Sequence, residues 1–414
     1  MLESFANFLQ NTGLYALISS GGIDAVKTII MIAIACVLLY LARVKKFEPL
    51  LLLPIAFGML LSNLPMIKDS SAIMMHTEFF TNPEYMTDGK YINVGYICQH
   101  GGLLDLLYLG VKLGIYPPLI FVGIGCMTDF GPLIANPKSI LLGAAAQFGV
   151  FFTFVGALVL SALVPSINFG IKEAASIGII GGADGPTAIY VTKSLAPALL
   201  PAIAVAAYSY MALIPVIQPP IMKLMTRKKD RMIVMEQLRP VSKTEKILFP
   251  IIVTIIVALI IPDAVSLVGC LMLGNLMKES GVVERLTKMA QNELMNIITL
   301  FLGVTVGATA TASSFLSAQT IGIIVLGLIA FCFSTVGGLF LGDIMCWVTK
   351  GKVNPLIGSA GVSAVPMAAR VSQTVGQKEN PSNFLLMHAM GPNVAGVIGS
   401  AVAAGVFLAM FGNL

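Results

Sequence analysis

The stretch from Ile177 to Pro197, IGIIGGADGPTAIYVTKSLAP, is apolar over most of its length, yet its middle holds three glycines, a proline and one carboxylate, Asp184. Glycine and proline do not sustain a regular helix, so broken backbone is predicted inside an apolar segment. In lipid, such backbone persists only where it is buried in protein or lines a water-filled cavity. An ionised aspartate at mid-membrane costs roughly 2.5–3.5 kcal/mol even on a lenient insertion scale. The stretch therefore predicts a cation or proton site in a transport protein.

The composition of the chain is that of a polytopic membrane protein. Of its 414 residues, 57% are hydrophobic and 11% are charged, whereas a soluble domain has about 25% charged residues. The length allows roughly ten crossings of about 20 residues each. The net charge of +5 comes from basic residues in short loops between apolar runs, so we expect contact with a lipid bilayer and no nucleic acid partner. Six scattered cysteines without a C-x-x-C pair argue against disulfides, zinc and iron–sulfur clusters.

Apolar runs and charged loops divide the chain into four parts, which are residues 1–95, 96–225, 226–246 and 247–414. An amphipathic helix is predicted at 1–20 and a weaker one at 100–116. Full spans are predicted at 26–43, 49–66, 139–164, 198–225, 247–262, 265–278, 320–348 and 384–412. We expect the span at 198–225 to break at Pro219–Pro220.

Basic residues predict the sidedness of the chain. The turn at 43–48 and the loop at 226–246 are rich in lysine and arginine. By the positive-inside rule both face the cytoplasm. The polar loop at 67–95 follows the next span and therefore lies on the opposite side.

Three short segments recur in the same order in the two halves of the chain. FVGI at 121–124 matches FLGV at 301–304, TFVGALVL at 153–160 matches STVGGLFL at 334–341, and IGGA at 180–183 matches IGSA at 357–360. In each half a glycine-broken run precedes a full span and a second one follows it, which is typical of secondary transporters with a binding site near the midplane. We therefore expect an all-α membrane protein of two related repeats, inverted if each has an odd number of crossings. Its broken helices are predicted around Asp129, Asp184, Thr309 and Gly358.

Oxygen-bearing groups in the two matching breaks suit a hard cation such as Na⁺. Asp184 supplies a carboxylate beside the carbonyls that its neighbouring glycines free, although this side chain is also a good cap for a helix beginning near Pro186. Both roles are compatible. The matching run in the second half offers neutral oxygens at Asn354, Gly358, Ser359 and Ser363.

Three further residues remain open to more than one interpretation. Arg370 either pairs with an acid or an anionic substrate group, or reaches the membrane interface. The Tyr210 phenol packs in its span, carries a proton or touches the ion. Asp129 either caps a broken helix or belongs to a pathway. Because the sequence has no phosphate-binding loop, Ser–His–Asp constellation or nicotinamide fingerprint, ATP hydrolysis and redox chemistry are not expected.

Four long motifs identify a family resemblance. They are GGADGPTAI at 181–189, AYSYMALIPVIQPP at 207–220, GCMTDFGPLIANP at 125–137 and NPLIGSAGVSAVPMAAR at 354–370. These motifs closely resemble the β subunits of the biotin-dependent sodium-pumping decarboxylases, which act on oxaloacetate, methylmalonyl-CoA, glutaconyl-CoA or malonate. The resemblance covers nearly the whole chain and shows no departure at the motif positions.

The resemblance implies a specific activity. A carboxytransferase subunit moves CO₂ from the substrate to biotin on a carrier subunit, and the membrane subunit decarboxylates carboxybiotin, consumes a proton and exports Na⁺. On the matching positions, it implies Na⁺ binding by Asp184, Asn354, Gly358 and Ser363. It implies catalytic or coupling roles for Arg370, Ser363 and Tyr210, with Arg370 as the hypothesised receiver of the carboxylate of carboxybiotin.

The resemblance also implies partners and a location. They are a biotin carrier and carboxytransferase subunit, a small single-span membrane subunit, a homotrimer similar to elevator-type transporters, and a bacterial or archaeal cell membrane. The alternative is a stand-alone Na⁺-coupled carboxylate carrier, which would move its substrate without a biotinylated partner.

Overall fold

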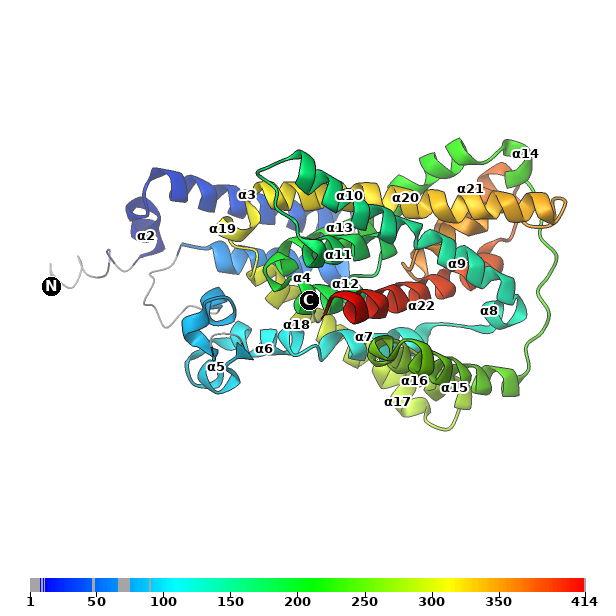
Figure 1. Cartoon of the computed structure of the whole chain (residues 1–414), viewed down its shortest axis with the longest axis horizontal. Coiled ribbons are helices and arrows are strands. Elements are labelled where there is room, and N and C mark those ends of the chain that lie inside the picture. The colour runs from blue at the N-terminus through cyan, green and yellow to red at the C-terminus, as the bar shows by residue number, and fades with distance from the viewer. Residues whose placement is uncertain are drawn as a thin grey trace.

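Helices form most of the computed structural model, which describes residues 8, 10, 12–46, 49–65, 75–88 and 91–412. Figure 1 shows an elongated bundle in which α3, α20 and α22 lie along the long axis. A two-stranded antiparallel sheet, with Met86 opposite Ile92 and Thr87 opposite Tyr91, interrupts the helices near the N-terminus. The expected all-α class is therefore confirmed apart from one short hairpin.

The N-terminal part holds two long helices and a small polar unit. Its elements are α2 (Gly13–Ser19), α3 (Gly22–Val44), α4 (Pro49–Asn63), the 3-10 turns η1 (Thr77–Phe80) and η2 (Pro83–Tyr85), β1 (Met86–Thr87), β2 (Tyr91–Ile92) and α5 (Val94–His100). Two predicted elements lie partly outside the described residues. For the helix at 1–20 these are residues 1–7, 9 and 11, and for the polar loop at 67–95 they are residues 67–74 and 89–90, together with residue 66 before it.

The first half continues to the basic loop. Its elements are α6 (Leu103–Lys112), α7 (Tyr116–Met127), α8 (Gly131–Ala135), η3 (Pro137–Ser139), α9 (Ile140–Ala146), α10 (Phe148–Leu163), α11 (Ile171–Gly178), η4 (Ile179–Gly182), α12 (Gly185–Leu195), η5 (Pro197–Leu199), α13 (Leu200–Met225) and α14 (Lys228–Arg231).

The second half begins at a capping box, in which Ser242 and Glu245 each accept a hydrogen bond from the other's backbone N–H at the start of α15. Its elements are α15 (Lys243–Ile260), η6 (Pro262–Ala264), α16 (Val265–Ser280), α17 (Glu284–Met289), the π-turn η7 (Ala290–Leu294), α18 (Met295–Ala308), α19 (Ala312–Phe315), α20 (Ala318–Val348), η8 (Pro355–Gly361), α21 (Met367–Glu379) and α22 (Leu386–Phe411).

All four predicted breaks are present. Helix α7 ends at Met127 before Asp129, and α18 ends at Ala308 before Thr309. The chain is also broken at η4 before Asp184, and at η8, which contains Gly358. Glycine and proline at these points stop the helices where the sequence indicates.

The number of long spans is smaller than the roughly ten that the length allows. In the described part of the chain, four helical segments are long and apolar enough to cross a membrane: Gly22–Val44, Pro137–Leu163, Ala318–Val348 and Leu386–Phe411. Two bent pairs raise the number to six, because α6 and α7 meet at 71°, and the segments Pro197–Met211 and Leu213–Met225, which run through η5 and α13, meet at 62°. Helices α11, α12, α16 and α21 are too short for a crossing of about 20 residues.

The bend in α13 corrects one prediction. The two straight parts are Pro197–Met211 and Leu213–Met225, so the chain bends before Pro215 and not at Pro219–Pro220. A proline lacks the N–H of its own residue and its ring clashes with the carbonyl four residues earlier. The residue four before Pro215 is Met211, which is where the first straight part ends.

Close helix crossings rely on glycine. Helices α7 and α16 cross where a Cβ on Gly125 would lie 2.0 Å from the Leu271 carbonyl oxygen and a Cβ on Gly274 would lie 2.0 Å from that of Val122. Small residues at crossings let backbones approach in membrane bundles, where apolar lipid supplies little drive for association. By contrast, α3 exposes Ile23, Val26 and other large apolar side chains, as expected for a helix that contacts lipid or another subunit.

Polar segments lie at the two ends of the bundle. Helix α14 and the extended segment that leads from it to α15 are at one end of the long axis, and α5 is at the other (Figure 1). The placement of the loops at 226–246 and 67–95 on opposite sides of a membrane stays a prediction.

Candidate functional site

The first break holds Asp184 in a fixed position. After η4, Ala183 adopts a left-handed conformation with φ of 56°, and Asp184 is extended with φ of −129°. A Cβ on Gly181 would lie 2.7 Å from the carbonyl carbon of Gly149, so the missing side chain lets η4 contact α10. The broken backbone is therefore buried in protein, as its position in an apolar segment requires.

Asp184 is the N-cap of α12 and only 5% exposed. Its Oδ2 accepts hydrogen bonds from the hydroxyls of Thr187 at 2.7 Å and Ser400, in α22, at 2.9 Å. Within the described ranges, its Oδ1 accepts one hydrogen bond, a long one of 3.4 Å from the Thr187 N–H. The predicted capping role is confirmed, and Oδ1 keeps lone pairs that a cation can use.

The second break is held by Asn354 and Gly358. The Asn354 side chain accepts a hydrogen bond from the Leu356 N–H at 3.0 Å and donates to the carbonyls of Arg231 and Ile233, each at 2.9 Å. A Cβ on Gly358 would lie 2.1 Å from the Gly338 carbonyl oxygen. Asn354 thus joins η8 to the last residue of α14 and to the loop that follows, and Gly358 lets η8 contact α20.

The two breaks meet, as the sequence predicts. The Ser363 N–H donates to the Gly182 carbonyl at 3.1 Å, which joins the segment after η8 to η4. The Ser363 hydroxyl donates to the Gly396 carbonyl in α22 at 2.9 Å. One helix therefore supports both breaks, because α22 also carries Ser400.

A cavity of about 310 Å³ lies at this meeting point. Its charged and hydroxyl-bearing lining residues are Thr128, Asp184, Ser363 and Arg370. Apolar side chains form the rest of its wall: Ile124, Met127, Pro186, Met211, Val365, Pro366, Met390 and Val397. Within the described part of the chain, no carboxylate lies within ion-pair distance of the Arg370 guanidinium.

Four residues that the sequence offers for the site make their contacts elsewhere. The Tyr210 hydroxyl donates to the Ile324 carbonyl and so ties α13 to α20. Asn354 and Gly358 hold η8, and neither lines the cavity. Ser359 bonds to the Leu356 carbonyl and the Ser372 hydroxyl. The structure therefore brings together Asp184, Ser363 and Arg370, while the roles assigned to these and the other residues stay predictions.

Sequence reasoning missed four polar residues near the break. They are Thr128, Gln147, Thr187 and Ser400. The Gln147 Oε1 is buried without a hydrogen-bond partner among the described residues, and a Cβ on Gly182 would lie 3.6 Å from it. An unpaired buried acceptor next to the break at Gly182 suits a cation or a water molecule. The pattern that could have identified these four residues in the sequence is a polar side chain inside an apolar span.

Asp129 lies outside this cavity. Its Oδ1 accepts a hydrogen bond from the Gly131 N–H at 2.8 Å, at the first residue of α8, and forms an ion pair with Lys246 at 3.5 Å. Asp129 thus satisfies the N–H of the first residue of α8, although the N-cap of that helix is Phe130. Its neighbour Thr128 lines the cavity that holds Asp184 and Arg370, which is the inner cavity.

Two broken helices, a buried carboxylate and an unpaired guanidinium at one cavity define a class of protein, namely membrane proteins with an intramembrane charged site. A family model described as the Na⁺-transporting oxaloacetate decarboxylase beta subunit matches residues 27–411. The chain therefore belongs to this family, as the motifs predict.

Three relatives illustrate the similarity. The chain is 58% identical over 412 residues to the methylmalonyl-CoA decarboxylase subunit beta of Propionigenium modestum, with 100% of both chains covered. It is 57% identical over 384 residues, 93% of each chain, to the glutaconyl-CoA decarboxylase subunit beta of Acidaminococcus fermentans. It is 52% identical over 436 residues to the probable oxaloacetate decarboxylase beta chain of Vibrio cholerae, with 98% of this chain and 99% of the relative covered.

Proposed function

We propose that this chain decarboxylates carboxybiotin carried by a partner subunit and couples the reaction to Na⁺ export. The observation that carries the proposal is the cavity that Asp184 and Arg370 share. Family membership favours this function over a stand-alone Na⁺-coupled carrier, because the relatives are named as decarboxylase subunits.

Arg370 receives the carboxylate of carboxybiotin. Its guanidinium has no ion-pair partner among the described residues, so it is free to bind an anion in two-pronged geometry. In the reaction the bond between the ureido nitrogen and the carboxyl carbon breaks, CO₂ leaves, and the nitrogen takes up one proton. Carboxybiotin anion plus H⁺ thus gives biotin plus CO₂.

Asp184 and Ser363 bind Na⁺ in the same cavity. Both line it, and the Asp184 Oδ1 has spare lone pairs. An unpaired buried carboxylate is several kcal/mol unfavourable, so a cation or proton accompanies it. Arrival of a cation at Asp184 and of an anion at Arg370 keeps the net charge of the cavity unchanged, which is a physical basis for coupling the two events.

The remaining predicted residues act on the site through the backbone. Asn354 and Gly358 fix the position of η8, from which the chain continues to Ser363 and Arg370. Tyr210 fixes α13 against α20. We assign these three residues to coupling between the site and the surrounding helices.

Two inverted repeats and an elevator-type movement complete the proposal. The three repeated segments support it, since each pair lies in elements of the same kind. The first pair, 121–124 and 301–304, lies in α7 and α18, which both end before a break. The second pair, 153–160 and 334–341, lies in the long helices α10 and α20. The third pair, 180–183 and 357–360, lies at the 3-10 segments η4 and η8. Broken helices in corresponding positions are the usual source of a midplane site.

The chain works in a multi-subunit complex at a bacterial cell membrane. The names of its relatives, "subunit beta" and "beta chain", support further subunits. We assign them as a biotin carrier and carboxytransferase and a small single-span subunit, with the β chains forming a trimer. The carrier approaches from the cytoplasm, the side on which the basic loop at 226–246 is predicted to lie.

Proteoliposomes test the proposed function. The complex is reconstituted and ²²Na⁺ uptake is measured with and without carboxylated carrier protein. We expect uptake only when carboxybiotin is supplied. Uptake driven by a carboxylate gradient in the absence of any biotinylated protein would establish the stand-alone carrier instead.

A further inference from the structure

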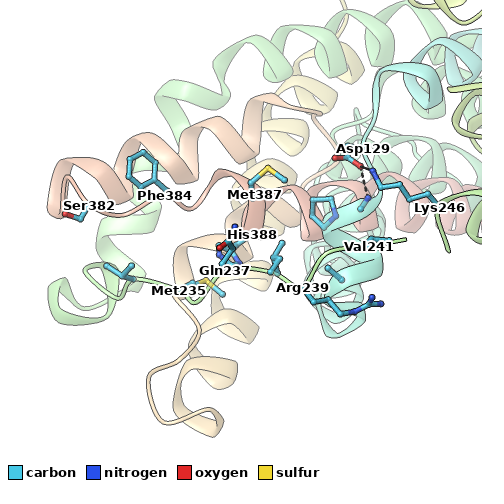
Figure 2. Close-up of a pocket in the computed structure, with 15 residues that line it drawn as sticks. Asp129, Met235, Gln237, Arg239, Val241, Lys246, Ser382, Phe384, Met387 and His388 are labelled. Carbon is cyan, nitrogen blue, oxygen red and sulfur yellow. Dashed lines mark hydrogen bonds and ion pairs between the residues drawn. The ribbon is translucent and has the colours of Figure 1, made fainter. Parts of the chain in front are cut away.

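A second cavity, of about 500 Å³, lies outside the first. Four segments line it: the start of α8 with Asp129, the chain between α14 and α15, the start of α15 with Lys246, and the chain that leads into α22, with Phe384 and His388. Residues 233–242, which lead from α14 to α15, have no regular secondary structure and cross one end of the bundle (Figure 1). Figure 2 shows the side chains of Asp129, Lys246, His388 and Phe384 around this outer pocket.

The outer pocket shares two of its walls with the inner cavity. At the break between α7 and α8, Thr128 lines the inner cavity and Asp129 lines the outer pocket. On α22, Met390 lines the inner cavity and His388 the outer pocket. Neighbouring residues on the same two elements thus face the two spaces, so a ligand in the outer pocket lies next to the cavity of Arg370.

His388 offers a polar atom without a partner. Its side chain is 9% exposed, and among the described residues no group forms a hydrogen bond with its buried Nδ1. A buried nitrogen in this state is unfavourable until a donor or acceptor reaches it. A ureido ring carries both an N–H donor and a carbonyl acceptor, so it satisfies either tautomer once the imidazole turns its Nδ1 toward the pocket that His388 lines.

Lys246 is the cation available to an arriving anion. Its ammonium is shared between Asp129 at 3.5 Å and Glu279 at 3.8 Å, both long for an ion pair. Arg239, by contrast, is bound to Glu245 through two hydrogen bonds of 2.8 and 3.3 Å. The Arg239 side chain and the capping contacts of Ser242 hold the pKa of Glu245 at about 2, so that pair stays ionised at neutral pH.

The rest of the outer pocket is apolar and open to a ring. Phe384 is 72% exposed and Met387 is 53% exposed at its edge, and Met235 and Leu238 lie in the loop that closes it. Large apolar side chains exposed beside a charged group suit a ligand with one apolar and one anionic part.

We propose that the outer pocket is a subsite for carboxybiotin, in which its ring packs on Phe384, its ureido group bonds to His388 and its carboxylate replaces Asp129 on Lys246. This inference rests on the proposed function and adds a docking step before the carboxylate reaches Arg370. No covalent bond forms or breaks in the outer pocket. Lys246, His388 and Phe384 are binding residues, and the reaction takes place in the inner cavity.

Steady-state kinetics of the reconstituted complex test this subsite. Decarboxylation is measured against the concentration of carboxylated carrier protein for Lys246→Gln and Phe384→Ala. We expect each variant to raise KM about tenfold, the scale of losing one charge-assisted or aromatic contact, with kcat within about twofold. Lys243→Gln is the matched control, because Lys243 lies on the same helix but outside the pocket. Its KM stays at the wild-type value.

A third variant separates ligand exchange from a structural role. Asp129→Asn removes the carboxylate that competes for Lys246, so we expect a KM below that of the wild type, whereas loss of a purely structural ion pair would raise it. Biocytin, used as an uncarboxylated probe, is expected to inhibit the wild type competitively and to inhibit Phe384→Ala about tenfold more weakly.

The outcomes are distinct. An unchanged KM in Lys246→Gln or Phe384→Ala, or a raised KM in Asp129→Asn, overturns the subsite while the wild type still decarboxylates carboxybiotin. A wild-type complex that releases no CO₂ from carboxybiotin overturns the proposed function itself. Phe384 is on the surface, so its truncation tests the subsite without disturbing the fold.

Discussion

Removal of the Arg370 charge tests the carboxylate receiver. Among the described residues, Arg370 and Asp184 are the two charged residues that line the inner cavity, so no second cation of this part of the chain replaces a lost guanidinium there. At about 4 Å and an effective dielectric constant of about 20, a pair of unit charges interacts by about 4 kcal/mol. Since about 1.36 kcal/mol of transition-state stabilisation corresponds to a tenfold change in rate, Arg370→Gln is expected to lower kcat/KM for carboxybiotin roughly 10³-fold.

Arg370→Lys divides this effect into charge and geometry. Lysine keeps the positive charge but loses the two-pronged contact. One charge-assisted hydrogen bond is worth about 1.5–3 kcal/mol, so we expect a loss of roughly 10- to 150-fold. Release of CO₂ from carboxylated carrier protein is measured in a single turnover, which isolates this step from the carboxytransferase.

A matched control lies on the same helix. Lys378 is also a cation of α21, but it does not line the cavity. Lys378→Gln is expected to stay within about twofold of the wild type. If Arg370→Gln released CO₂ at the wild-type rate, Arg370 would not be the receiver, and if Lys378→Gln were as slow, the effect would be one of helix stability.

Two further variants test the residues that hold the breaks. Gly358→Ala places a Cβ 2.1 Å from the Gly338 carbonyl oxygen, so we expect the free energy of unfolding, measured by thermal denaturation, to fall by about 1–3 kcal/mol or more. Gly156→Ala is the control, because its Cβ would be 3.7 Å from Leu326, and its melting temperature should be close to that of the wild type. Tyr210→Phe removes the hydroxyl that joins α13 to α20, and we expect fewer Na⁺ ions moved per CO₂ released; an unchanged ratio would contradict a coupling role.

The positions of the breaks were predictable because their cause is local. Glycine, proline and a capping aspartate at 181–186 stop a helix whatever surrounds them. Matching runs in the two halves then indicated that the breaks meet, and the hydrogen bond from Ser363 to Gly182 agrees. The bend of α13 was placed too late because three prolines lie in that helix and the sequence does not say which one bends it.

The partners of Asp184 were not predictable for a different reason. Thr187 is three residues away, within reach of a capping pattern, but Ser400 is 216 residues away and reaches Asp184 only through the packing of α22. The contacts of Asn354 are of the same kind. Its amide nitrogen donates to the carbonyls of Arg231 and Ile233, which are 123 and 121 residues away in the sequence. Long-range packing decides both outcomes.

The most direct test of the central claim is ²²Na⁺ uptake into proteoliposomes by the Asp184→Asn variant of the complex, driven by decarboxylation of carboxybiotin. Asparagine keeps the size of the side chain and an acceptor for the Thr187 N–H, so the cap is retained while the charge is lost. We predict that uptake falls to the level of protein-free liposomes. Uptake at the wild-type rate would contradict the assignment of Asp184 as the Na⁺ ligand.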